Sequence, residues 1–184
     1  GGDGNDTLLG GSGNDSLKGE AGNDLLQPQD GSDAVSGGPG NDSYYLAGTV
    51  MTQTLFEYTG EGQDILEFSA IDEDLVFQVK PAIIEVATSG GDTVTAKHAS
   101  AVEAILGGNR KDSFAIAATT HLPSLLIDGG STAGADFDKL NQLEYSAYHL
   151  AVQVDLASAV DFSINAVGSA TGLKGVVNLR HVTG

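Results

Sequence analysis

The first 45 residues place an apolar side chain at the same position in every nine. Five consecutive nine-residue units follow one another without insertion, and each has leucine, valine or tyrosine at its eighth position: GGDGNDTLL, GGSGNDSLK, GEAGNDLLQ, PQDGSDAVS and GGPGNDSYY. The last three residues of each unit read as a short strand whose middle side chain faces the core. Two units would complete one flattened coil, so we expect alternate units to stack on opposite edges.

Two polar positions are as regular as the apolar one. Glycine fills the fourth position of every unit and aspartate fills the sixth. If alternate units stack, the aspartates form two columns. Asp6, Asp24 and Asp42 belong to one column, and Asp15 and Asp33 belong to the other.

A bare column of aspartates is unstable. Stacked strands lie about 4.8 Å apart, and like charges at that spacing repel by roughly 1 kcal/mol in water and by several at an effective dielectric near 20. One buried side chain per unit contributes about 1.5–3 kcal/mol, against roughly 1 kcal/mol or more for ordering the backbone of each residue. We therefore expect this segment to be disordered without a cation.

Calcium suits the gap between stacked aspartate turns. It takes roughly 6–8 oxygen ligands from carboxylates and backbone carbonyls in a tolerant geometry, whereas Mg²⁺ requires a tight octahedron. Glycines at the first, second and fourth positions are expected to adopt positive φ and to turn carbonyl oxygens into the bend. The predicted Ca²⁺ ligands come from the first, third, fourth and sixth positions: Gly1, Asp3, Gly4, Asp6, Gly10, Gly13, Asp15, Gly19, Gly22, Asp24, Asp30, Asp33, Gly37, Gly40 and Asp42.

Residues 1–45 resemble the RTX (haemolysin-type calcium-binding) nonapeptide repeat, GGxGxDxUx. The resemblance implies an all-β fold, with a right-handed, calcium-filled parallel β-roll over residues 1–46. It also implies export through a type I secretion channel in an unfolded state, followed by folding in the calcium outside the cell. The fourth unit departs from the pattern because Pro28 and Gln29 replace both leading glycines. That puts its turn, and any ion that relies on its first carbonyls, in question.

Residues 47–184 form a second predicted region, a β-rich flanking or capping part with degenerate repeats. Short alternating runs at 75–79, 83–86 and 151–156 read as strands. Damaged copies of the repeat contain Asp64, Asp112 and Asp136, which are candidate further ligands, although isolated turns more often use such aspartates for hydrogen bonds. Residues 137–156 resemble the spacers between repeat blocks of RTX adhesins and toxins. We expect either an irregular β-solenoid that continues the roll or a β-sandwich-like cap.

Charge and composition limit the classes of partner that the chain can bind. The chain has 25 acidic and 8 basic residues, a formal charge of -17, which favours calcium ions and argues against nucleic acid. No apolar run approaches the roughly 18 residues of a membrane span, and the absence of cysteine excludes a disulfide scaffold. Both ends fall within the repeat-like pattern, so we expect a piece of a longer protein that is secreted or held at the cell surface.

Catalytic motifs are sparse. The four histidines lie too far apart for a short zinc motif: His98, His121, His149 and His181. No serine lies in the GxSxG motif of hydrolases. A glycosidase needs only two facing carboxylates, which the sequence alone leaves open, but most of the acids occupy the sixth repeat position. We expect no enzyme activity in these residues.

The predicted function is a calcium-binding RTX module that folds on binding Ca²⁺ outside the cell and supports the folding and secretion of a larger exported protein. One alternative is the ligand-binding segment of an RTX adhesin. It would add a glycan or cell-surface partner, reached through the parent protein, with Tyr58, Tyr145 and Tyr148 as candidate stacking residues. Another alternative is the accessory C-terminal domain of a secreted enzyme.

Overall fold

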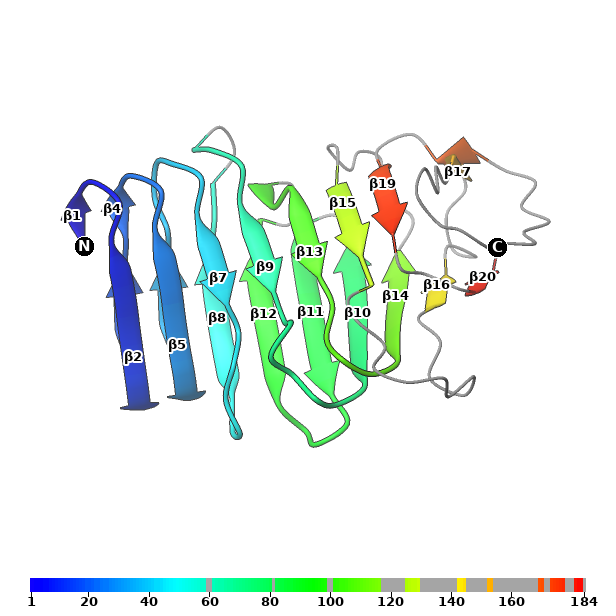
Figure 1. The fold of residues 1–184 in the computed structure, drawn as a ribbon, viewed down its shortest axis with the longest axis horizontal. Helices are drawn as coiled ribbons and strands as arrows, with labels where there is room; N and C mark the ends of the chain where they lie inside the picture. The colour runs from blue at the N-terminus through cyan, green and yellow to red at the C-terminus, as the bar shows by residue number, and fades with distance from the viewer. Residues whose placement is uncertain are drawn as a thin grey trace.

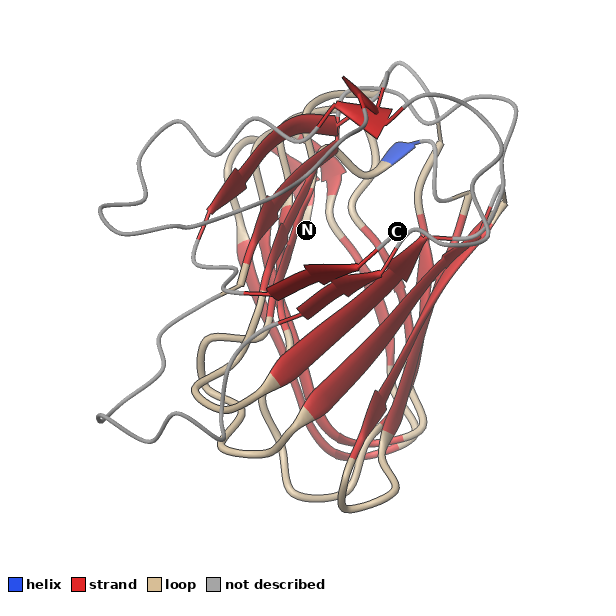
Figure 2. Ribbon diagram, turned by 90° about the vertical axis from the view of Figure 1, so that its right-hand side faces the viewer, coloured by secondary structure: helices blue, strands red, loops and turns tan. Residues whose placement is uncertain are grey.

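The chain winds between two facing β-sheets. The computed structural model describes residues 1–58, 61–80, 82–98, 101–116 and 125–129, and the backbone of short strands at 142–144, 152–153, 169–170, 173–177 and 181–183. Successive turns of the coil lie side by side along the molecule, from β2 in blue to β19 in red (Figure 1). Figure 2, turned by 90°, shows the two sheets face to face with loops at their ends.

The first sheet has seven strands in the described part of the chain, and all of its pairings are parallel. In spatial order they are β2 (Thr7–Gly13), β5 (Leu25–Gly31), β7 (Ser43–Tyr45), β9 (Ile65–Glu67), β13 (Ala104–Leu106), β15 (Leu125–Asp128) and β19 (Leu173–Val177).

The second sheet has nine strands among the described residues, of which β11 runs antiparallel to both neighbours. In spatial order they are β3 (Ser16–Lys18), β6 (Ala34–Ser36), β8 (Thr52–Phe56), β12 (Thr93–Lys97), β11 (Ile83–Thr88), β10 (Leu75–Lys80), β14 (Asp112–Ile116), β16 (Gln142–Glu144) and β20 (His181–Thr183). Two short pairs flank them: β1 (Gly2–Asp3) with β4 (Glu20–Ala21), and β17 (Val152–Gln153) with β18 (Ser169–Ala170).

The core is a ladder of eighth-position side chains. Leu26 is in register with Leu8 and Tyr44 in the first sheet, and Val35 is in register with Leu17 and Leu55 in the second. All of these side chains are buried except Leu8, which is partly buried and packs against the core. The prediction that the eighth residue of each unit faces the core is therefore confirmed for the repeats, and β5 buries Pro28 as well as Leu26.

The sheets continue beyond the repeats without a break. β7 pairs with β9, and β6 pairs with β8, across the predicted domain boundary at residue 46. Of the two alternatives for the later residues, the described strands follow the continuing solenoid; the boundary itself stays a prediction. No helix among the described residues is long and apolar enough to cross a membrane.

The main irregularity is a three-stranded meander within the second sheet. β10 and β11 confirm the strands predicted at 75–79 and 83–86, and β12 returns the chain to the side of β8. The strand predicted at 151–156 lies mostly outside the described residues, with β17 as its described part. The meander adds two strands to this sheet that the opposite sheet does not match.

Aromatic rings fill the space beneath the meander. Phe77 stacks on Phe114 with ring centroids 4.3 Å apart and meets Phe68 edge to face at 5.2 Å. All three rings are fully buried. This part of the solenoid therefore has a hydrophobic core that does not involve the aspartate columns.

We predict that Phe77→Ala lowers the free energy of unfolding by about 3–5 kcal/mol, because it removes a buried ring and leaves a cavity. Val76, on the outward face of the same strand, is 45% exposed, and Val76→Ala should cost less than about 1 kcal/mol. Urea unfolding of both variants in saturating calcium provides the comparison. Equal losses would contradict the described packing of β10.

Candidate calcium site

Each repeat turn has two backbone positions in the left-handed region. At the fourth position the glycines have φ between 111° and 145°. At the second position Gly2, Gly11 and Gly38 have positive φ, and so do Glu20 (76°) and Gln29 (68°). The fourth unit, whose turn the sequence put in question, thus keeps that turn without a leading glycine, although a side chain in this region costs of the order of 1 kcal/mol.

The first-position glycines serve a different purpose from the one predicted. Gly10, Gly19 and Gly37 do not adopt positive φ. Instead, a Cβ built on Gly19 would overlap both the Asp24 carboxylate and the Gly37 carbonyl oxygen. Glycine is required here because two oxygens converge on the space that a side chain would fill.

Hydrogen bonds link the sixth-position aspartates into the two predicted columns. The Asp6 N–H donates to Asp24 Oδ1 at 2.8 Å, and the Asp24 N–H donates to Asp42 Oδ1 at 2.7 Å. In the other column the Asp15 N–H donates to Asp33 Oδ1 at 2.8 Å. Each partner lies 18 residues further along the chain, which confirms two units per coil.

The second carboxylate oxygen of these aspartates is buried without a hydrogen-bond donor. This holds for Oδ2 of Asp15, Asp24, Asp33 and Asp42. Buried polar atoms in native proteins are almost always paired, and an unpaired charge is costly to bury. A carboxylate oxygen beside a backbone carbonyl oxygen is the donor set that Ca²⁺ prefers, so these residues fit the ion.

Side chains alone do not complete a cation site. The described residues contain no group of three or more acidic, histidine or cysteine side chains arranged to hold a metal ion. An ion in the columns must therefore take several of its oxygens from the loop backbone. The stacked fourth-position glycines allow this close approach, because a Cβ on Gly22 or Gly40 would overlap the glycine carbonyl of the preceding turn.

The two third-position aspartates lie away from the columns. Asp30 is partly exposed, and its Oδ1 accepts the N–H groups of Thr49 at 2.6 Å and Val50 at 3.3 Å. These bonds lower the pKa of Asp30. Asp3 lies on the exposed edge strand β1. The structure thus assigns Asp30 to closure of the neighbouring loop, and the role of both residues as ligands stays a prediction.

A second ladder was missed by the sequence interpretation. Asn5 Oδ1 accepts the Asn23 N–H, Asn23 Oδ1 accepts the Asn41 N–H, and Asn41 Oδ1 accepts the Gln63 N–H, each at 2.9 Å. Its signal was present, because asparagine fills the fifth position in four of the five units. These amides satisfy the outer backbone of the turns next to the aspartates.

The shorter column ends at an amide. The Asp33 N–H donates to Gln53 Oε1 at 3.0 Å, so Gln53 takes the place of the next aspartate. Its Nε2 donates to the Gln29 carbonyl oxygen at 2.7 Å. The neutral Gln53 side chain thus accepts the hydrogen bond that an aspartate accepts elsewhere in the column, and it also donates one to a loop carbonyl. It needs no cation to do so.

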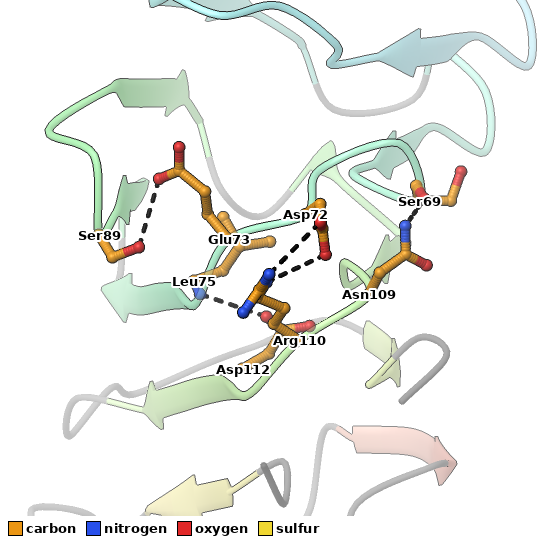
Figure 3. A network of polar contacts seen from close by, with 8 residues as sticks. All are labelled: Ser69, Asp72, Glu73, Leu75, Ser89, Asn109, Arg110 and Asp112. Carbon is orange, nitrogen blue, oxygen red and sulfur yellow. Dashed lines mark hydrogen bonds and ion pairs between the residues drawn. The ribbon is translucent and has the colours of Figure 1, made fainter. Parts of the chain in front are cut away.

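The loop before β14 leads into Asp112, the first residue of that strand, whose carboxylate accepts hydrogen bonds at both oxygens. Asp112 Oδ1 accepts the Leu75 N–H at 3.2 Å, and Oδ2 accepts the Gly108 N–H at 2.7 Å. Arg110 from the same loop pairs with Asp72 at 3.0 Å (Figure 3). Asp112 therefore has the hydrogen-bonding role expected of an isolated turn. Asp136 lies outside the described residues.

The longer column continues past the repeats. The Asp42 N–H donates to Asp64 Oδ1 at 2.9 Å, 22 residues further on, and the Asp64 N–H donates to Glu103 Oε2 at 2.8 Å, after another 39. Asp64 Oδ2 is again buried and unpaired. The pairing of Ala104 with Leu126 brings Leu125 next to Glu103, so among the described residues the acidic column is followed as far as Glu103.

Burial also raises the pKa of carboxyl groups in the column and beside it. Loss of solvent raises the pKa of Asp42 to about 6, with the charges of Asp64 and Asp24 adding to the effect. Loss of solvent and the neighbouring Asp64 raise the pKa of Glu57 to about 9. Without an ion, these groups hold their protons up to a higher pH than an exposed carboxyl group does.

The stacked turns, the glycines that make room for oxygens and the unpaired carboxylates define a calcium-binding parallel β-roll. The family model of the RTX calcium-binding nonapeptide repeat, which contains four copies, matches residues 1–33 and 29–44. Residues 1–44 are therefore RTX repeats, and they bind Ca²⁺. No curated protein matches the chain.

The tyrosines predicted to stack on a glycan are the remaining candidate site residues. Tyr58 is exposed, and its ring lies 4.9 Å from that of His98. Tyr145 and Tyr148 lie outside the described residues. A glycan or cell-surface partner, and the absence of catalysis, stay predictions.

We predict that Asp24→Ala is more damaging than Asp33→Ala. Asp24 has an aspartate on both sides in its column, whereas Asp33 has Asp15 on one side and the Gln53 amide on the other. The first variant should lose more calcium ions per chain and melt at a lower temperature. Ion counts and melting temperatures at fixed calcium measure this, and equal losses would show that the column arrangement is wrong.

We also predict that protons stabilise the calcium-free fold. Folding raises the pKa of Asp42 to about 6 and of Asp112 to about 7, so the folded state binds protons that the unfolded chain releases. Their destabilising effect is absent below the unfolded carboxyl pKa of about 4 and complete above the folded values. Calcium-free protein should gain β structure by circular dichroism between about pH 7.5 and pH 5. Loss of β structure over that range would refute the prediction.

Proposed function

We propose that this chain is a calcium-driven folding module of an exported protein. The observation that carries the proposal is the row of buried, unpaired Oδ2 atoms in both columns. With Ca²⁺ between them, each unpaired oxygen gains a ligand bond and the like charges are screened. Without Ca²⁺, the same charges oppose stacking, and one buried side chain per unit does not offset the loss of backbone entropy.

This dependence suits secretion. A chain that stays unfolded at the low free calcium inside a cell remains able to pass through a channel, and it folds where calcium is abundant. Extracellular calcium modules bind with dissociation constants of about 10⁻⁴–10⁻³ M, and we expect the repeats to fall in that range. Folding outside the cell would also oppose backward movement through the channel.

The later solenoid offers a surface on which the roll can stack. The alternating strands β10 to β12 bury several side chains each, among them Leu75, Phe77, Val79, Ile84 and Val94. Solenoid turns gain most of their stability from neighbouring turns, so a stable end favours growth of the next turn. We infer that residues from 47 onward act as a cap and folding nucleus for the repeats.

The test is calcium titration of the chain in excess chelator, followed by circular dichroism. We expect β structure to appear at millimolar Ca²⁺ and not at equal Mg²⁺, because the loop oxygens need a tolerant coordination geometry. An unchanged spectrum on chelation would overturn the proposal.

Hydrogen exchange in excess chelator shows which residues need calcium to fold. Amides of residues 1–45 should exchange freely, and those of β10 to β12 should keep more protection. Equal exchange in both parts would show that residues after 47 depend on the metal as well and do not act as an independent nucleus.

A further inference from the structure

Glu57 is an acidic residue at an inward-facing position. It follows β8, two residues after buried Leu55, and its own side chain is only 1% exposed. The register of β3, β6 and β8 aligns it with Gly19 and Gly37, the first-position glycines of the repeat. A carboxylate therefore stands where the repeat has no side chain at all.

The contacts of Glu57 replace those of a repeat backbone. Its Oε1 accepts the Gly37 N–H at 3.2 Å, whereas the equivalent Gly19 N–H donates to the Ser36 carbonyl oxygen. The Gly37 N–H also donates to the Tyr44 hydroxyl at 2.6 Å, which places that phenol beside the carboxylate. Glu57 Oε2 is buried and has no hydrogen-bond donor.

Three further acids in or beside this site each have a carboxylate oxygen in the same condition. Oδ2 of Asp42, Oε2 of Glu61 and Oδ2 of Asp64 are all buried without a donor. The Glu57 and Asp64 carboxyl groups contact each other. Neither ion pair formed by the described residues, Lys80 with Glu85 or Arg110 with Asp72, involves this cluster. Two contacting carboxyl groups in a buried site need either a proton or a cation between them.

We propose that Glu57 and Asp64 hold a further calcium ion between the fifth repeat unit and the loop that follows it. Asp42 and Glu61 add negative charge around the ion. Because three side chains do not already surround one point, backbone carbonyls complete its ligands, as in the repeats. The site lies beyond the residues that match the repeat, which end at 44, and it rests on the proposed calcium-dependent folding. Its higher carboxylate count predicts that it fills at lower calcium than the repeat sites.

The test counts the calcium ions bound per chain at saturation, by native mass spectrometry and equilibrium dialysis. Glu57→Gln keeps the shape of the side chain and removes its charge. Asp64→Asn does the same for the facing group. The matched control is Glu67→Gln on the neighbouring strand β9, where the partly exposed carboxylate accepts the Ser69 hydroxyl at 2.6 Å.

Glu57→Gln and Asp64→Asn should each bind one ion fewer than the wild-type chain, and the lost ion should be the one that binds first. Glu67→Gln should keep the full count. A full count in either site variant would overturn the site and leave a shared proton as the link between the two carboxyl groups, while calcium folding of the repeats stands. If the wild-type chain binds no calcium, the proposed function itself fails.

A measurement on the unmodified chain covers the case in which the variants do not fold. Terbium ions occupy oxygen-rich calcium sites and emit when a nearby tyrosine is excited. Terbium held by Glu57 would lie close to the Tyr44 phenol, so sensitised emission should appear with the first equivalent added. Its absence in folded protein would contradict the proposed site.

Discussion

The repulsion between buried aspartates stacked one coil apart is the constraint on which this fold depends. Each Asp N–H in the longer column finds its partner in the next carboxylate, so the geometry that joins the coils also brings like charges together. The hydrogen bonds use one oxygen of each carboxylate and leave the other buried and unpaired. The first-position glycines Gly19 and Gly37 are a consequence of the same arrangement, because a Cβ at either position would fill the space that an aspartate Oδ2 occupies.

The chain solves this constraint in three ways along its length. In the repeats, the unpaired aspartate Oδ2 atoms are available to bind a cation. Gln53 replaces an aspartate by an amide that accepts from one loop and donates to the next. Asp112 receives a backbone N–H on each oxygen, while Arg110 from the same loop pairs with Asp72. The dependence on calcium is therefore expected to fall from the N-terminal turns towards the meander, where buried rings such as Phe77 take over the stabilising role.

The repeat made much of the first 45 residues predictable, and the reasons are local. A strict period of nine fixes which side chain faces inward and which aspartates stack, as Leu26 and Asp24 illustrate. The meander could be anticipated only as separate strands, because nothing in its alternation shows that β12 pairs with β8, whose residues lie 41 positions earlier in the chain. Glu57 and Gln53 had no motif to mark them. Their roles arise from coils of irregular length that bring them into register with the repeat.

A crystal structure of the calcium-loaded chain, with anomalous scattering data to identify the ions, would test the central claim most directly. The account predicts calcium ions in line along both columns, each bound by an aspartate Oδ2 that the hydrogen bonds leave free and by carbonyl oxygens of the adjacent turns. Columns in which Asp24 and Asp42 are bridged by water or by protons, in a roll that is otherwise intact, would contradict it.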